Sequence, residues 1–136
     1  MNKEITELLA DYDNAWNARD AVTYSNLFLE DATAIFFTLD GNKIELLNRT
    51  AILDFYIPQF QGLAARPNVH HHTQITRTQQ ISNGLLNADG DAIITDVKAE
   101  TGETVTLRKW AVVFTLVNKE KQWRIFSLRA FERPLT

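Results

Sequence analysis

Three consecutive histidines, His70-His71-His72, are the residues of this sequence best suited to chemistry. Side chains on a strand alternate between two faces, so His70 and His72 share one face and His71 points to the other. His71 has the same parity as the apolar Val69 and Ile75, which predicts that it faces the interior. A neutral imidazole there could act as a general base near pH 7. The alternative is a surface or hydrogen-bonded structural histidine.

The other two histidines could in principle share a metal ion. A metal site needs a third or fourth ligand and supporting hydrogen bonds, and the sequence offers no obvious set. Cysteine is absent, which excludes disulfides, thiolate nucleophiles and zinc–thiolate sites. Glycines are few and unclustered, so no phosphate-binding loop is expected. We therefore predict no metal and no cofactor.

A histidine base needs a partner that stabilises negative charge on the substrate, and Tyr12 and Tyr56 are the available phenols. Tyr12 lies on an apolar helical stripe, and its more ordinary interpretation is a packed core residue whose hydroxyl is satisfied. Glu132 follows the alternation of Leu128 and Ala130 near the end of the chain. Glu132 could be an acid–base group at a pocket mouth, whereas an ion pair with a strand arginine is the more ordinary alternative.

Large aromatic residues recur on the segments that carry these candidates. Aromatics at helical or strand spacing usually form a core, and beside an open cavity they also favour a flat, apolar ligand. The predicted ligand-binding residues are Trp16, Phe36, Tyr56, Phe60, Trp110 and Leu128.

Helices in the first half of the chain must position these residues. Six apolar residues fall on one stripe of a first helix, which Asn2 can cap: Ile5, Leu8, Leu9, Tyr12, Ala15 and Trp16. Asp20 can cap a second helix whose apolar positions extend to Phe28. Asn48 can cap a third helix, and Pro58 predicts its kink or its end.

The rest of the chain predicts strands. A strand begins at Asp31, Asp40-Gly41 forms a turn, and a return strand follows. Four long antiparallel strands come after Pro67, with turns at 87–90, 101–102 and 118–121. The expected return strand is 43–47 and the long strands are 69–86, 91–100, 103–117 and 122–133. This order predicts a single α+β domain over residues 1–136, with the helices on one face of the sheet.

The last two strands are apolar on both faces, unlike a sheet with one face in water. Three helices cover one face, so a second copy of the chain is expected on the other. The alternative is that the strands curl over the helices and bury both faces within one chain. The turn at 118–121 could hold two or three residues, which leaves open the faces of Arg108 and Trp110.

Composition excludes several classes of function. A chain of 136 residues with a net charge of −3 lacks the basic balance typical of nucleic-acid binding. No apolar run is long enough to span a membrane, and the first residues do not resemble a signal peptide. We expect a cytoplasmic protein without nucleic-acid or membrane partners.

Several motifs together resemble the SnoaL-like branch of the nuclear-transport-factor-2-like superfamily. They are Tyr12…Ala15-Trp16-Asn17-Ala18-Arg19-Asp20, Leu27-Phe28-x-Glu30-Asp31-Ala32-Thr33, Gly41, Asn48–Ile52, Asp89–Ala92 and Gln122–Ile125. The resemblance implies a cystatin-like cone, in which a curved antiparallel sheet wraps around three helices and leaves an apolar pocket. It also implies a homodimer through the outer sheet face.

The resemblance does not fix the function, because this fold hosts many activities. Ketosteroid isomerases of the superfamily use a tyrosine similar in position to Tyr12, but their two acids fall at about Phe36 and within Ala111–Thr115, where no carboxyl group stands. We expect a domain that binds a small apolar molecule. The alternatives are a cofactor-free lyase or isomerase that uses His71 with Tyr12 or Tyr56, and a non-catalytic dimeric assembly module.

Overall fold

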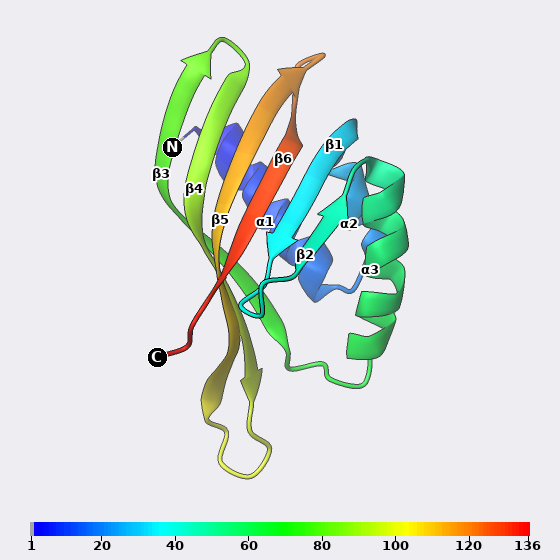
Figure 1. Ribbon diagram of the computed structural model, residues 1–136, viewed down its shortest axis with the longest axis vertical. Coiled ribbons are helices and arrows are strands. Elements are labelled where there is room, and N and C mark those ends of the chain that lie inside the picture. Colours follow the sequence, from blue (N-terminus) through cyan, green and yellow to red (C-terminus); the bar gives the residue numbers. More distant parts are fainter. Residues whose placement is uncertain (1) are drawn as a thin grey trace.

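The computed structural model describes residues 2–136, in which three helices accompany one curved, unclosed sheet of six strands (Figure 1). The helices are α1 (Lys3–Asn17), α2 (Ala21–Asn26) and α3 (Arg49–Leu63). The strands are β1 (Phe28–Phe37), β2 (Lys43–Leu46), β3 (His70–Ser82), β4 (Leu85–Val97), β5 (Thr104–Lys119) and β6 (Gln122–Arg133). The predicted α+β cone is confirmed.

The strand order is β2-β1-β6-β5-β4-β3, so the first and last strands of the chain meet inside the sheet. The pairing of β1 with β6 is parallel and every other pairing is antiparallel. Helix α1 packs against β3 and β6, while α3 packs against β1 and β2, toward the opposite edge of the sheet (Figure 1). Helices α1 and α3 thus lie along the inner, concave face.

The three helix starts were predicted correctly. The side chains of Asn2, Asp20 and Asn48 each accept a hydrogen bond from a backbone N–H in the first turn of the helix that follows. The six residues of the predicted apolar stripe on α1 are all buried. Capping and periodicity are local properties, so they could be recognised without the rest of the fold.

Helix α3 does not end at Pro58. It continues to Leu63, because Pro58 lies on the exposed face and the carbonyl group that loses its partner belongs to Asp54, itself an exposed residue. Tyr56 and Phe60, on either side of the proline, keep their places in the core.

The predicted start of the first strand was also wrong. Helix α2 ends at Asn26, and β1 begins at Phe28 rather than Asp31. The Leu27 carbonyl accepts a hydrogen bond from the Ile125 backbone N–H at 2.9 Å, and Phe28 then pairs with Ile125 on β6. Pairing with a strand from the far end of the chain therefore overrides the helical pattern of the sequence.

The hairpin between β3 and β4 turns at Asn83-Gly84, not at the predicted 87–90. Gly84 has a φ of +78°, the conformation that glycine adopts at little cost. Gly90 instead lies inside β4 opposite Ile75, where a β-carbon would come within 2.1 Å of the Gln74 carbonyl oxygen. Gly90 is needed for this close backbone approach rather than for a turn.

The hairpin between β5 and β6 turns through Glu120 and Lys121, whose φ angles are 53° and 67°. This two-residue turn pairs Lys119 with Gln122 and so places Trp110 opposite Glu132. A register shift near Phe126 then puts Ile125 and Leu128 together in the core, although strict strand alternation would place residues three apart on opposite faces. Phe126 is correspondingly 40% exposed.

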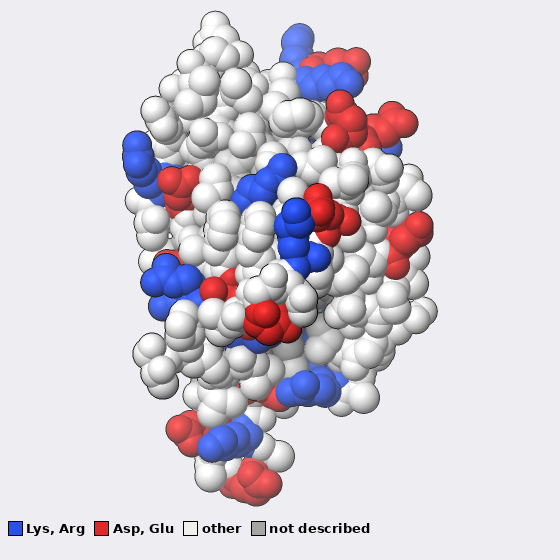
Figure 2. All heavy atoms as spheres, in the orientation of Figure 1, with Lys and Arg blue, Asp and Glu red and all other residues white. Residues whose placement is uncertain are grey.

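The outer face of the sheet is not buried within the chain. Phe37 and Phe131 stack there with ring centroids 5.0 Å apart, and Phe131 is 42% exposed. The alternative in which one chain buries both faces is therefore wrong. Figure 2, in the orientation of Figure 1, shows a largely uncharged surface on which basic and acidic groups are interspersed. Among residues 2–136, no helix is both long enough and apolar enough to cross a membrane.

Candidate functional site

A cavity of about 120 Å³ lies between α1, α3 and the inner face of the sheet. Its walls include all six residues predicted from the sequence to contact a ligand, together with Tyr12 and His71. The six are Trp16, Phe36, Tyr56, Phe60, Trp110 and Leu128. Their location on one cavity agrees with the sequence analysis, while their role in binding stays a prediction.

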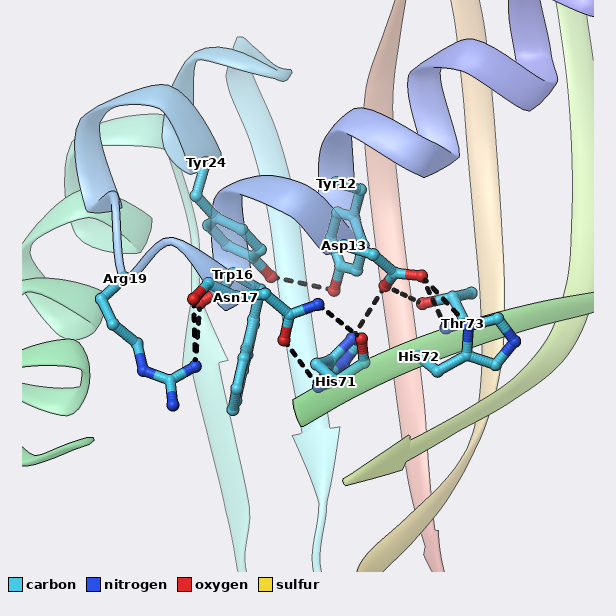
Figure 3. Close-up of polar contacts among 9 residues, drawn as sticks. All are labelled: Tyr12, Asp13, Trp16, Asn17, Arg19, Tyr24, His71, His72 and Thr73. Carbon is cyan, nitrogen blue, oxygen red and sulfur yellow. Dashed lines mark hydrogen bonds and ion pairs between the residues drawn. The ribbon is translucent and has the colours of Figure 1, made fainter. Parts of the chain in front are cut away.

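His71 lies at the start of β3 with its side chain 6% exposed. Its Nδ1 atom is 2.9 Å from Oδ1 of Asp13 on α1 (Figure 3). A carboxylate accepts hydrogen bonds, so Nδ1 carries a proton, and the neutral form of this tautomer has its lone pair on Nε2. Within residues 2–136, the ring makes its one hydrogen bond through Nδ1. Nε2 is not among the fully buried atoms that lack a partner, so it remains accessible. The ring is therefore fixed by one nitrogen and free to accept a proton at the other.

Asp13 is held by two further hydrogen bonds. The backbone N–H and the hydroxyl of Thr73 each donate to its carboxylate at 2.8 Å. Burial by itself would raise the pKa of Asp13, but the hydrogen bonds from His71 and Thr73 outweigh this effect and lower the pKa below its ordinary value. Asp13 therefore remains a carboxylate beside the imidazole.

Asn17 fixes the main chain of the same histidine. Its Nδ2 donates to the His71 carbonyl oxygen at 2.9 Å, and the His71 backbone N–H donates to Asn17 Oδ1 at 2.7 Å (Figure 3). Because Asp13 and Asn17 are four residues apart on α1, one face of this helix holds both the side chain and the backbone of His71.

Aromatic rings restrict the imidazole further. The Trp16 ring centroid is 4.9 Å from that of His71 with an interplanar angle of 31°, and Tyr12 approaches at 5.7 Å. Rings at these distances make favourable contacts and leave little space for rotation. Packing and hydrogen bonding thus select the same orientation of the imidazole.

Three buried tyrosine side chains form a group next to the Asp13–His71 pair. The Tyr24 hydroxyl donates to the Tyr12 hydroxyl at 2.9 Å, which leaves the Tyr12 O–H free to donate elsewhere. Burial raises the pKa of Tyr12 and Tyr24 well above the ordinary value, and it raises the pKa of Tyr56 to about 12. All three remain protonated at neutral pH, so Tyr12 and Tyr56 can donate hydrogen bonds into the cavity but cannot act as bases there.

Glu132 does not line the cavity. Its Oε2 atom is 3.1 Å from Arg108 Nε, and its Oε1 accepts the Leu39 backbone N–H at 3.1 Å. The ion pair with a strand arginine, which was the alternative interpretation of Glu132, is the arrangement that the structure shows. Arg108 itself lies on the cavity wall, with its guanidinium carbon 4.6 Å from the centre of the Trp110 ring.

The remaining histidines do not assemble a metal site. His72 is 64% exposed, and its Nδ1 lies 3.9 Å from Asp13 Oδ2. The structure groups no three His, Cys, Asp or Glu side chains in a metal-binding arrangement anywhere in residues 2–136.

Sequence reasoning missed Asp13 and Asn17, and it left open whether Arg108 faces the cavity. Asp13 and Asn17 border the apolar stripe of α1 one turn apart, and both are short polar side chains rather than the long charged ones typical of a solvated face. That spacing is a usable signal for polar groups that reach a neighbouring strand. The sequence has no comparable signal that His71, 58 positions after Asp13, is the partner of these two residues.

Comparison with known proteins identifies the fold independently. The family model of the SnoaL-like domain matches residues 2–129. A search of curated proteins gave no match.

Solved structures resemble the whole chain. An NTF2-like protein with a cystatin-like fold from Novosphingobium aromaticivorans is 19% identical with a TM-score of 0.80, over 98% of this chain and 82% of that one. A ketosteroid isomerase-like protein from Erwinia carotovora atroseptica is 15% identical with a TM-score of 0.69, over 98% and 99% of the two chains. At these identities the likeness establishes the fold.

Proposed function

The chain belongs to the SnoaL-like domain family, and we propose that it is a cofactor-free lyase or isomerase acting on a small, mostly apolar molecule. The fold supports a small-molecule-binding or isomerase-type domain. The proposal of catalysis goes further and rests on one observation. The Asp13 carboxylate fixes one nitrogen of His71, while the other nitrogen is unpaired in a ring that borders an apolar cavity.

This arrangement suits a general base. When Nε2 takes a proton, the ring becomes an imidazolium, and the adjacent Asp13 carboxylate stabilises the new positive charge. The apolar wall strengthens that interaction because it excludes water. A carboxylate also prevents the ring from rotating or changing tautomer, so the lone pair stays directed at the substrate.

The proposed reaction begins with removal of a proton from carbon next to a carbonyl group. The C–H bond breaks, its proton moves to His71 Nε2, and the electron pair moves onto the carbonyl oxygen. Tyr12 or Tyr56 donates a hydrogen bond to that oxygen. In an isomerisation the proton returns to a different carbon, and in an elimination the electron pair expels a neighbouring hydroxyl group, which takes up the proton and leaves as water.

The second candidate is a domain that binds the same kind of molecule without converting it. The apolar cavity supports both functions equally, and only the Asp13–His71 pair favours turnover. Experimentally, the two are separated by whether a bound probe loses its proton.

The Kemp elimination of 5-nitrobenzisoxazole provides this test, because the probe is flat and apolar and needs only a base. The base removes the ring C–H proton, the N–O bond breaks, and the coloured 2-cyano-4-nitrophenolate forms. We expect wild-type protein to accelerate the reaction and His71→Gln to lower kcat/KM by about 10²-fold or more. His70→Gln, which changes an exposed neighbour, is the matched control and should leave the rate unchanged.

Equal rates for wild type and His71→Gln would contradict a base at this position. Binding of the probe without turnover would support the non-catalytic domain. Binding can be followed in parallel by calorimetry, so that the two outcomes are not confused.

We also propose that two copies associate through the outer sheet face. The stacked Phe37–Phe131 pair and the exposed Phe126 supply the apolar contact. Asp89 and Asp91 on β4 lie across this face from Arg129 on β6, so a twofold axis would bring opposite charges together. Sedimentation should show a dimer that Phe131→Asp converts to monomer, whereas Ile81→Asp on the edge strand β3 should not.

A further inference from the structure

His71 and Arg108 occupy the same row of the sheet. His71 pairs with Ile94 on β4, and Ile94 pairs with Arg108 on β5. All three side chains line the cavity. Neighbouring strands are separated by about 4.8 Å, so the two backbone positions lie about 10 Å apart. This spacing can accommodate a small ring between the imidazole and the guanidinium.

The Arg108 side chain is held in place by two contacts. Glu132 accepts a hydrogen bond from its Nε, and the Trp110 ring packs against its guanidinium face. Glu132 is in turn anchored by the Leu39 backbone N–H. The hydrogen bond from Arg108 lowers the pKa of Glu132, which therefore stays charged and keeps the arginine oriented.

The outer edge of the guanidinium remains available. Neither Nη atom of Arg108 has a hydrogen-bond partner within residues 2–136. Two parallel N–H groups at this edge match the two oxygens of a carboxylate, which is the geometry that arginine recognises best. Arg108 is also the one lysine or arginine among the described residues that line this cavity.

We propose that the molecule bound in this cavity is a small aromatic or alicyclic carboxylate. Its carboxylate pairs with Arg108 at one end, its ring lies against the aromatic wall, and its reacting carbon faces His71. This inference rests on the proposed function, because it assigns the substrate class of the same cavity. It gives Glu132 the role of a positioning residue that acts through Arg108.

Binding of two probes of one shape tests the inference. The carboxylate 2-naphthoate and the neutral 2-naphthamide differ only in charge and in one heteroatom. Calorimetry of the wild-type protein at pH 7 should give a Kd about tenfold lower for 2-naphthoate. That preference should weaken as salt is added, while the affinity for 2-naphthamide stays constant.

Arg108→Met retains much of the side-chain volume and removes the guanidinium. It should abolish the preference for 2-naphthoate and leave the affinity for 2-naphthamide unchanged. Arg108→Lys should retain part of the preference, because a single ammonium group lacks the forked geometry. Lys109→Met is the matched control, since it removes the same charge from the next residue on β5, which is not part of the cavity wall.

Each result bears on one of the two proposals. Equal affinities for the two probes, or a preference that survives in Arg108→Met, would overturn the carboxylate assignment and leave the general base intact. If Arg108→Met does not fold, the wild-type protein still tests the assignment, because a preference for 2-naphthoate that does not weaken with added salt would contradict a charge pair. Failure of both probes to bind would contradict the cavity as a ligand site and so overturn both proposals. If the wild-type protein binds the probes but does not accelerate the Kemp elimination, only the proposal of catalysis is overturned.

Discussion

Oδ1 of Asp13 lies 2.9 Å from Nδ1 of His71, although the two residues are 58 positions apart in the sequence. One belongs to α1 and the other to β3, so the contact also joins the helical layer to the edge of the sheet. The same pair therefore serves both stability and the proposed chemistry.

Asp13→Asn should destabilise the protein in a pH-dependent way. The pKa of Asp13 is lowered in the folded state from an ordinary value of 3.8, so its stabilisation is present above about pH 4 and is lost as the pH falls through the lower, folded value. We expect a loss of about 2 kcal/mol at pH 7 in urea unfolding. The variant should also show a flatter decline of stability in acid than wild type. Asp11→Asn, on the exposed face of α1, is the control.

Asn17→Ala should loosen the start of β3. The substitution removes both hydrogen bonds to the His71 backbone and leaves two partly buried main-chain groups without this partner. A loss of about 1–2 kcal/mol in the free energy of unfolding is expected. Faster hydrogen exchange of the His71 amide should accompany it. Asn14→Ala on the exposed side of the same helix should change stability by less than about 0.5 kcal/mol, and equal losses for the two variants would contradict the bridging role.

Gly90→Ala should be severely destabilising, although it adds only one methyl group. The new β-carbon would lie 2.1 Å from the Gln74 carbonyl oxygen and 2.8 Å from the Ile75 α-carbon, so the β3–β4 pairing must shift. We expect a loss of about 3 kcal/mol or more. Gly62→Ala provides the contrast, because nothing lies within 4 Å of its β-carbon and α3 should gain about 0.5–1 kcal/mol. A folded Gly90→Ala variant of wild-type stability would refute the close approach.

The tyrosines should resist ionisation until the protein unfolds. The sequence has three tyrosines, and burial raises the pKa of Tyr12 and Tyr24 well above 10.0 and that of Tyr56 to about 12. Absorbance at 295 nm should therefore show no tyrosinate near pH 10 in the folded protein. A normal titration near pH 10 would show that the phenols are accessible.

The raised values also predict alkaline unfolding. A group whose folded pKa is raised contributes stability that is complete below the unfolded value, near 10, and is lost as the pH rises through the folded value. The loss is about 1.4 kcal/mol per pH unit for each phenol. Tyr56→Phe should reduce the slope of stability against pH above 10 in urea unfolding.

Much of the fold could be read from the sequence because the signals are local. The apolar stripe from Ile5 to Trp16 and the caps Asn2, Asp20 and Asn48 follow from the helical period and from hydrogen bonding within a few residues. Strand parity likewise placed His71 inside the molecule. The family motifs extended these local signals to a confirmed fold.

Long-range contacts decided what local signals could not. Phe28 belongs to β1 rather than to a helix because it pairs with Ile125. Gly90 lies inside β4 rather than in a turn, where the Gln74 backbone approaches it closely. A register shift beside Phe126 reversed the expected alternation on β6. Strand register depends on pairing free energies summed over whole strands, so an isolated segment does not contain it.

The residues of the candidate site also divide into those that local signals indicate and those that long-range contacts bring together. Residue type and periodicity in the sequence assigned His71 and Tyr12 to interior faces and marked Trp16 and Phe36 as candidates for a cavity wall, because the period specifies which face a side chain takes. The sequence left the face of Trp110 open. Only the tertiary structure brought Asp13 to His71 and Glu132 to Arg108. A hydrogen bond between distant residues forms where folding places two atoms within about 3 Å, and that distance is a property of the assembled chain.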